Sequence, residues 1–154
     1  MTGMPTETTI PPVSPRACGL SVQRLLCDGH ACLYRLQGIV DARGELVPLD
    51  FGSLPFVPAR AFLVRDVPQG QARGGHAHAH GQQLLVCIAG KVDVELRHRG
   101  GSGHVALHAG SDALLVKAGV WAQQVYGPDA VLLVLASSAY DPDAYVHECA
   151  CPRA

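Results

Sequence analysis

Three histidines stand at alternate positions within residues 70–83, and their side chains are the ones in this sequence best suited to chemistry. In an extended strand, successive side chains point to opposite faces, so His76, His78 and His80 would share one face. A helix would scatter them. Because an imidazole can bind a metal or accept and return a proton near neutral pH, this face is a metal site, an acid–base site or a coincidence of spacing.

The residues around the histidines indicate a strand. Glycines flank the segment on both sides, and the apolar run 84–88 follows directly. From Ala31 onward, short apolar runs are broken by Gly, Pro and Asp at intervals of roughly ten residues, which is typical of an all-β sandwich or barrel. Strands are expected at 31–40, 60–67, 75–80, 83–89, 91–98, 104–108, 112–117, 120–126 and 131–137.

Two of these segments predict how the sheet is buried. In residues 92–97, apolar side chains alternate with charged ones, so this strand is expected to be half buried. Residues 131–136 are continuously apolar, which predicts a strand buried on both faces.

The length and composition indicate one domain. The chain has 154 residues, of which 48% are hydrophobic, enough for a sizeable core. The first residues are rich in proline and threonine, without an apolar period. We therefore expect a flexible leader at 1–29, a single domain at 30–148 and a short tail at 149–154.

The charge pattern argues against two classes of partner. With a net charge of −1 and 16% charged residues, the chain has no basic surface typical of proteins that bind nucleic acid or membranes. No apolar run approaches the roughly 20 residues of a membrane span, and no signal peptide is evident. The six cysteines show no metal-binding or disulfide spacing. A cytoplasmic location is expected, with no nucleic-acid or membrane partner.

The spacing of Gly70, His76, His78, Gln83 and Gly90 resembles the first motif of the cupin superfamily. The usual glutamate of that motif is Gln83 here. A second motif would place a histidine at Ala122, which has only a methyl group. The resemblance implies a cupin double-stranded β-helix, a jelly-roll-like barrel with few or no helices and a site at its mouth.

The same comparison bears on the metal question. Cupin metals are usually held by two histidines and a glutamate of the first motif and a histidine of the second, so half of that ligand set is missing. His80 could supply a third imidazole, but three alternate residues on a straight strand span about 13 Å, which is difficult for one ion to bridge. No metal or other cofactor is therefore expected. A metal-dependent cupin using His76, His78 and His80 stays as one alternative.

A finer resemblance, from about Tyr34 to Glu148, is to the WxcM-like sugar 3,4-ketoisomerases of the cupin superfamily. It is carried by several short motifs in a fixed order. They are residues 41–46, 54–56, Arg60, 73–78, Gln83, Val120 with Trp121, 133–137 and 140–145.

This resemblance implies a cofactor-independent isomerase. It would move the keto group between C4 and C3 of a dTDP-4-keto-6-deoxyhexose through an enediolate, with imidazoles carrying the protons. By position, His76 matches the catalytic base and His78 a second active-site imidazole. The substrate-binding positions that the resemblance implies are Arg43, Arg60, Phe62, Arg73, His80, Gln83, Trp121 and Tyr140.

Departures from the family pattern leave a second alternative open. Phe62 replaces a tyrosine used in proton shuttling, and Ala122 replaces a histidine or arginine beside the tryptophan. Arg43 resembles the variant that makes the galacto-configured product, and His80 could be a substitute proton carrier. The alternative is a non-catalytic cupin that binds a nucleotide sugar. The resemblance also implies a homodimer in which strands within 31–60 extend the partner's sheet.

Overall fold

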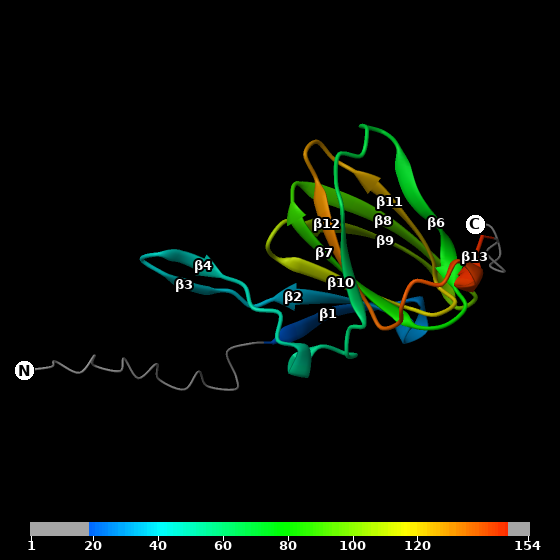
Figure 1. Ribbon diagram of the computed structural model, residues 1–154, viewed down its shortest axis with the longest axis horizontal. Helices are drawn as coiled ribbons and strands as arrows, with labels where there is room; N and C mark the ends of the chain where they lie inside the picture. The colour runs from blue at the N-terminus through cyan, green and yellow to red at the C-terminus, as the bar shows by residue number, and fades with distance from the viewer. Residues whose placement is uncertain (1–18, 148–154) are drawn as a thin grey trace, which may run out of the picture.

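Antiparallel strands dominate the computed structural model, which describes residues 19–147 (Figure 1). The strands are β1 (Leu20–Leu26), β2 (Ala31–Leu36), β3 (Ile39–Asp41), β4 (Gly44–Leu46), β5 (Arg60–Val64), β6 (Ala72–His78), β7 (Gln82–Ala89), β8 (Lys91–His98), β9 (Gly101–His108), β10 (Asp112–Lys117), β11 (Trp121–Tyr126), β12 (Val131–Ala136) and β13 (Tyr145–Val146). The helices of this region are three short 3-10 turns: η1 (Cys27–Gly29), η2 (Phe51–Ser53) and η3 (Pro142–Ala144). None of them is long and apolar enough to cross a membrane. The prediction of an all-β fold with few helices is confirmed.

The strands form two facing sheets that enclose the main core. One sheet has the order β1-β2-β10-β7-β12-β5, and the other has the order β13-β6-β11-β8-β9. Both contribute side chains to a single buried cluster between them. In β8, Val92, Val94 and Leu96 are fully buried in this cluster, while the charged side chains between them face outward. This confirms the half-buried strand that the alternation predicted.

A second core covers the outer face of the six-stranded sheet. The segment that follows β4 crosses this face and packs Val47, Leu49, Leu54 and Phe56 against it. The strand β12 is therefore buried on both sides, with Leu132 in the main core and Leu135 in the second. The continuous apolar run at 131–136 is explained by these two layers.

The domain begins earlier than the composition predicted. Residues 20–29, which the prediction assigned to the flexible leader, form β1 and η1, and β1 pairs with β2 along its whole length. Leu20 packs on the second core, and Cys27 is buried in the first. The strand was missed because its alternation is broken by a register shift between Val22 and Arg24. The rest of the predicted leader, 1–18, and the predicted tail, 149–154, lie outside the described residues.

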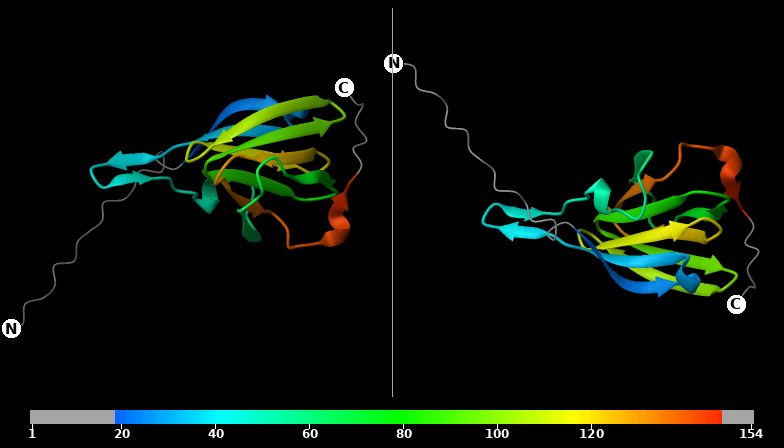
Figure 2. Two further views of the ribbon diagram at one scale, coloured as in Figure 1. Left: turned by 90° about the horizontal axis from the view of Figure 1, so that it is seen from above. Right: turned by 90° about the horizontal axis from the view of Figure 1, so that it is seen from below.

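One hairpin stands apart from the two sheets. The strands β3 and β4 pair only with each other and project away from the barrel (Figures 1 and 2). The apolar side chains of Val40 and Leu46 on this hairpin are 74% and 63% exposed. A two-stranded hairpin cannot bury a core of its own, so it is marginally stable in isolation.

Candidate functional site

A β-bulge at two glycines sets the direction of the side chains on strand β6. Gly74 and Gly75 in β6 both have positive φ angles, and the pairing of β6 with β11 shifts by one residue at this point. A Cβ atom at Gly74 would lie 2.8 Å from the carbonyl oxygen of Ala122, so a larger residue would not fit. In a regular strand, Arg73 and His76 are three residues apart and would face opposite sides of the sheet. The bulge brings both to the same cavity.

The cavity lies between the two sheets and has a volume of about 150 Å³. Its deeper wall is apolar, with Val64, Leu85, Val120 and Val134 among its residues. Polar groups line the rest of it. They are Arg73, His76, His78, Gln83, Gln124, Tyr126 and Tyr145. An apolar pocket with a few convergent polar groups is the usual form of a small-molecule site.

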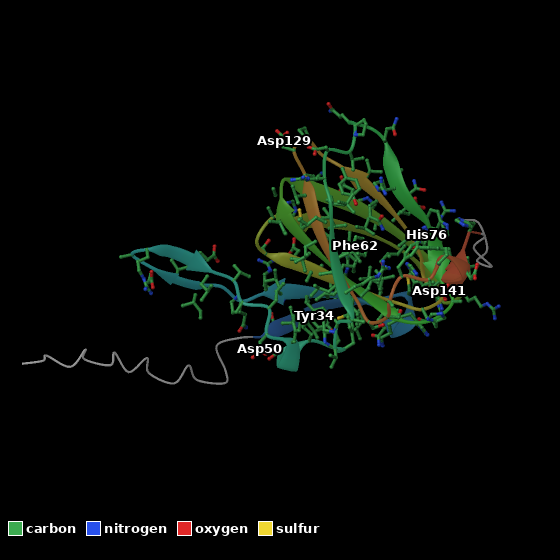
Figure 3. The ribbon with its side chains drawn as sticks, viewed as in Figure 1. Tyr34, Asp50, Phe62, His76, Asp129 and Asp141 are labelled. Atoms are coloured by element: carbon green, nitrogen blue, oxygen red, sulfur yellow. The ribbon has the colours of Figure 1, made fainter. Side chains whose placement is uncertain are left out.

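Two imidazoles and a phenol form a compact cluster on one side of this cavity. The rings of His76 and His78 are 5.0 Å apart between centroids and nearly perpendicular. Tyr145, directly opposite His78 on the neighbouring strand β13, places its ring 4.5 Å from that of His76 and 5.0 Å from that of His78. Figure 3 shows His76 beside the η3–β13 segment and Phe62 on β5. The prediction that His76 and His78 share one face agrees with this geometry.

Both imidazoles are held neutral by their surroundings. Burial lowers the pKa of His76, and the nearby His147 lowers it further, whereas a backbone hydrogen bond at Gly74 raises it. Burial also lowers the pKa of His78, to about 4, and the neighbouring His76 and Arg60 side chains lower it further. At neutral pH each ring can therefore accept a proton. His76, whose pKa is not lowered as far, is the stronger base of the two.

Arg60 lies beside the cavity in a smaller pocket. This pocket has a volume of about 20 Å³ and shares His78, Gln83 and Tyr145 with the main cavity. The guanidinium of Arg60 lies over the rings of Phe62, at 5.0 Å, and Tyr140, at 5.3 Å. Its Nε atom is buried, with no hydrogen-bond partner among the described residues. The Tyr140 side chain is 64% exposed and forms the outer edge of this cluster.

His80 lines the smaller pocket beside His78 and is absent from the lining of the main cavity. The strand β6 ends at His78, and Gly81, with a φ of 82°, begins the turn into β7. His80 lies beyond that end and pairs with Asp141, its Nε2 atom 3.4 Å from the carboxylate. His80 therefore lies with His78 and Arg60 at the smaller pocket, and His76 lines only the main cavity.

Two other predicted residues lie away from the cavity. Trp121 is next to Ala122 in β11, and because Ala122 lines the cavity, Trp121 faces the outer surface of the sheet. There the guanidinium of Arg97 covers its ring at 4.7 Å. Arg43 lies at the tip of the projecting hairpin and binds Asp41 at 2.6 Å. The structure therefore removes Trp121 from the cavity wall and Arg43 from this chain's own cavity.

The ligand set for a metal ion is not assembled in the chain between residues 19 and 147. There, no three His, Cys, Asp or Glu side chains lie close enough together to hold one ion. His76 and His78 face the cavity, but the Gln83 amide and the Ala122 methyl stand where further ligands would be needed. The three-histidine site of the metal-dependent alternative is thus not formed by these residues.

Some lining residues were not predicted from the sequence. Gln124 and Tyr126 follow Ala122 at alternate positions of β11, so strand periodicity from Ala122 could have found them. Tyr145 and His147 could not be found in this way. Their place beside His76 depends on the pairing of β13 with β6, which are far apart in the sequence.

The chain is similar to characterised sugar isomerases. Residues 30–151 match the family model described as FdtA: WxcM-like, C-terminal. A curated relative from Aneurinibacillus thermoaerophilus, TDP-4-oxo-6-deoxy-alpha-D-glucose-3,4-oxoisomerase, is 32% identical over 112 residues, which cover 71% of this chain and 81% of the relative.

Solved structures agree in fold and in the kind of protein. The QdtA 3,4-ketoisomerase from Thermoanaerobacterium thermosaccharolyticum in complex with TDP is 29% identical, with a TM-score of 0.73 over 77% of this chain and 88% of that one. A mutant of the same enzyme in complex with TDP-4-keto-6-deoxyglucose is 28% identical, with the same TM-score and coverage. The WlaRB TDP-quinovose 3,4-ketoisomerase from Campylobacter jejuni is 29% identical, with a TM-score of 0.72 over 77% and 92% of the two chains.

Proposed function

The chain belongs to the WxcM-like family, and we propose that it is a sugar 3,4-ketoisomerase. It moves the keto group between C4 and C3 of a dTDP-4-keto-6-deoxyhexose. The observation that carries this proposal is the pair of neutral imidazoles, His76 and His78, in the cavity of a chain of this family. Substrate and product are isomers, so proton transfers suffice for the chemistry.

His76 acts as the base. It takes the hydrogen from C3 beside the 4-keto group, which leaves an enediolate, and a proton then returns at C4. A neutral imidazole is required for the first step, and the burial of His76 provides it. His78, with a pKa of about 4, stays neutral and offers a ring N–H to an enediolate oxygen.

Proton exchange tests catalysis against binding alone. The wild-type protein, incubated with dTDP-4-keto-6-deoxyglucose in deuterated water, is expected to incorporate deuterium at carbon and to form the 3-keto isomer, as measured by NMR. A protein that binds the nucleotide sugar but exchanges no hydrogen would instead be the non-catalytic cupin. Binding of dTDP, measured by calorimetry on the same sample, separates that outcome from a misfolded preparation.

Arg60 supplies positive charge for the diphosphate or the enediolate. Its buried Nε atom has no hydrogen-bond partner among the described residues, and the guanidinium borders the cavity that contains the imidazoles. A planar, permanently charged fork suits a phosphate or an enediolate oxygen. Arg73, on the main cavity wall, is the second cationic group of the site.

Replacing Arg60 with methionine is expected to weaken dTDP binding by about ten- to a hundredfold, because a hydrogen bond to a charged group contributes about 1.5–3 kcal/mol. Methionine keeps an unbranched side chain between the Phe62 and Tyr140 rings. Isothermal titration calorimetry measures the change. Arg24→Met, on β1, removes the same charge at a distance from the cavity and is expected to bind dTDP as the wild type does. Equal affinity of the Arg60 variant and the wild type would contradict this role.

We also infer that the enzyme is a homodimer built through the β3–β4 hairpin. The hairpin leaves its own barrel and exposes Val40 and Leu46, whereas β1 and β5 are edge strands of the six-stranded sheet. A second copy that pairs with this hairpin would bury those side chains and cover an open edge. In such a dimer, Arg43 at the hairpin tip would reach the partner rather than its own cavity. That the enzyme works in the cytoplasm stays a prediction.

A further inference from the structure

The proposed isomerisation needs a proton carrier for oxygen as well as one for carbon. When a keto group moves from C4 to C3, the hydrogen on C3 is replaced by one on C4, and the hydrogen of the C3 hydroxyl must pass to the oxygen on C4. His76, as the base, accounts for the first exchange. The inference that follows rests on the proposed function and concerns the second exchange.

Tyr145 is the phenol nearest to both imidazoles. The β13–β6 pairing places it opposite His78, and its ring meets the ring of His76 edge to face at 4.5 Å. It lines the main cavity and the small pocket that holds Arg60, so its side chain forms part of the boundary between them. A sugar whose reacting carbon lies against His76 would therefore also lie against Tyr145.

The other candidate groups are less suitable. Phe62, on the cavity wall, has no hydroxyl. Tyr126 is only 3% exposed, and burial raises its pKa to about 12. It is therefore a weaker acid than an ordinary phenol. His80 faces Asp141 outside the main cavity, and Tyr140 stands at the outer edge of the Arg60 cluster.

We propose that Tyr145 is the catalytic residue that moves the hydroxyl proton between the two sugar oxygens. As His76 takes the C3 hydrogen, the C–H electron pair forms the C3–C4 double bond, and the Tyr145 phenol gives its proton to the oxygen on C4. The phenolate then takes the proton of the oxygen on C3, whose electrons form the new carbonyl. The double-bond electrons accept the proton from the His76 imidazolium at C4. Both side chains return to their starting states.

Tyr145→Phe tests this role, because it removes the hydroxyl and keeps the ring that packs on the two imidazoles. Product formation is expected to fall about a hundredfold, a typical contribution of one acid–base group. The affinity for dTDP should stay within about twofold, because the charged groups that bind phosphate are unchanged. The His78 N–H still stabilises the enediolate oxygen, so enolisation by His76 should fall less than isomerisation does. The ratio of deuterium in recovered substrate to product formed in deuterated water should therefore rise.

The outcomes separate this role from a structural one. A variant that isomerises at the wild-type rate would overturn the proposal, as would a variant in which exchange and isomerisation fall by the same factor. Tyr34→Phe is the matched control, since it removes a hydroxyl in the second core on the outer face of the sheet, and it should behave as wild type. Wild-type protein that neither exchanges nor isomerises would overturn the proposed function itself, which a failure of Tyr145→Phe alone would not.

Discussion

Replacing His76 with asparagine is expected to lower the rate of isomerisation by about 10²- to 10⁴-fold, the range typical for loss of a general base. Asparagine is similar in size and polarity but cannot accept a proton in this pH range. The substitution should also abolish deuterium incorporation, because the C3 hydrogen is no longer removed. NMR of dTDP-4-keto-6-deoxyglucose in deuterated water measures both rates.

The wild-type pH profile provides an independent check on the same residue. The base must be neutral, so kcat/KM is expected to fall as the pH drops through the pKa of His76. Burial lowers that pKa, which places the acid limb of the profile below the ordinary imidazole value of 6.5. His78, with a pKa of about 4, stays neutral over most of this range.

The control for His76→Asn is His104→Asn. His104 lies exposed on β9, the edge strand of the five-stranded sheet that is separated from β6 by β11 and β8. The same substitution there should leave the rate and the acid limb of the pH profile unchanged. If His76→Asn retained deuterium exchange and isomerisation, the base would be another group, and the proposed mechanism would be wrong.

The Val40→Asp/Leu46→Asp double variant is expected to convert the dimer into a monomer. In the proposed dimer these side chains are buried, and burying a large apolar side chain contributes about 1.5–3 kcal/mol. A carboxylate at either position makes burial in the interface unfavourable, because a buried charge without a partner costs free energy. Two substitutions in each of two chains should therefore weaken association by more than about a thousandfold. Sedimentation velocity at micromolar concentration distinguishes the two states.

The design separates loss of association from loss of fold. Both positions lie on a hairpin outside the two cores, so circular dichroism and thermal unfolding should show that the monomer keeps its sheets. Val125→Asp, on the outer face of the five-stranded sheet, adds one carboxylate elsewhere and is expected to leave the dimer intact. A wild-type protein that sediments as a monomer at all concentrations would overturn the dimer.

Residues close together in the sequence explain the parts of this protein that could be predicted. The alternation in residues 92–97 and the apolar run at 131–136 gave the burial of β8 and β12, because side-chain direction along a strand has a period of two. The same period placed His76 and His78 on one face. Together with the order of short motifs, these local patterns determined the fold class, the family and the two central imidazoles.

Tertiary structure decided everything that depends on where a strand ends and which strand lies beside it. His80 lies outside the main cavity because β6 stops at His78. Trp121 lies outside it because its neighbour Ala122 faces inward. Tyr145 entered the site because β13 pairs with β6, and Arg43 moved to a hairpin outside the barrel. Strand ends and pairings are set by contacts between distant segments, and the local sequence does not encode them.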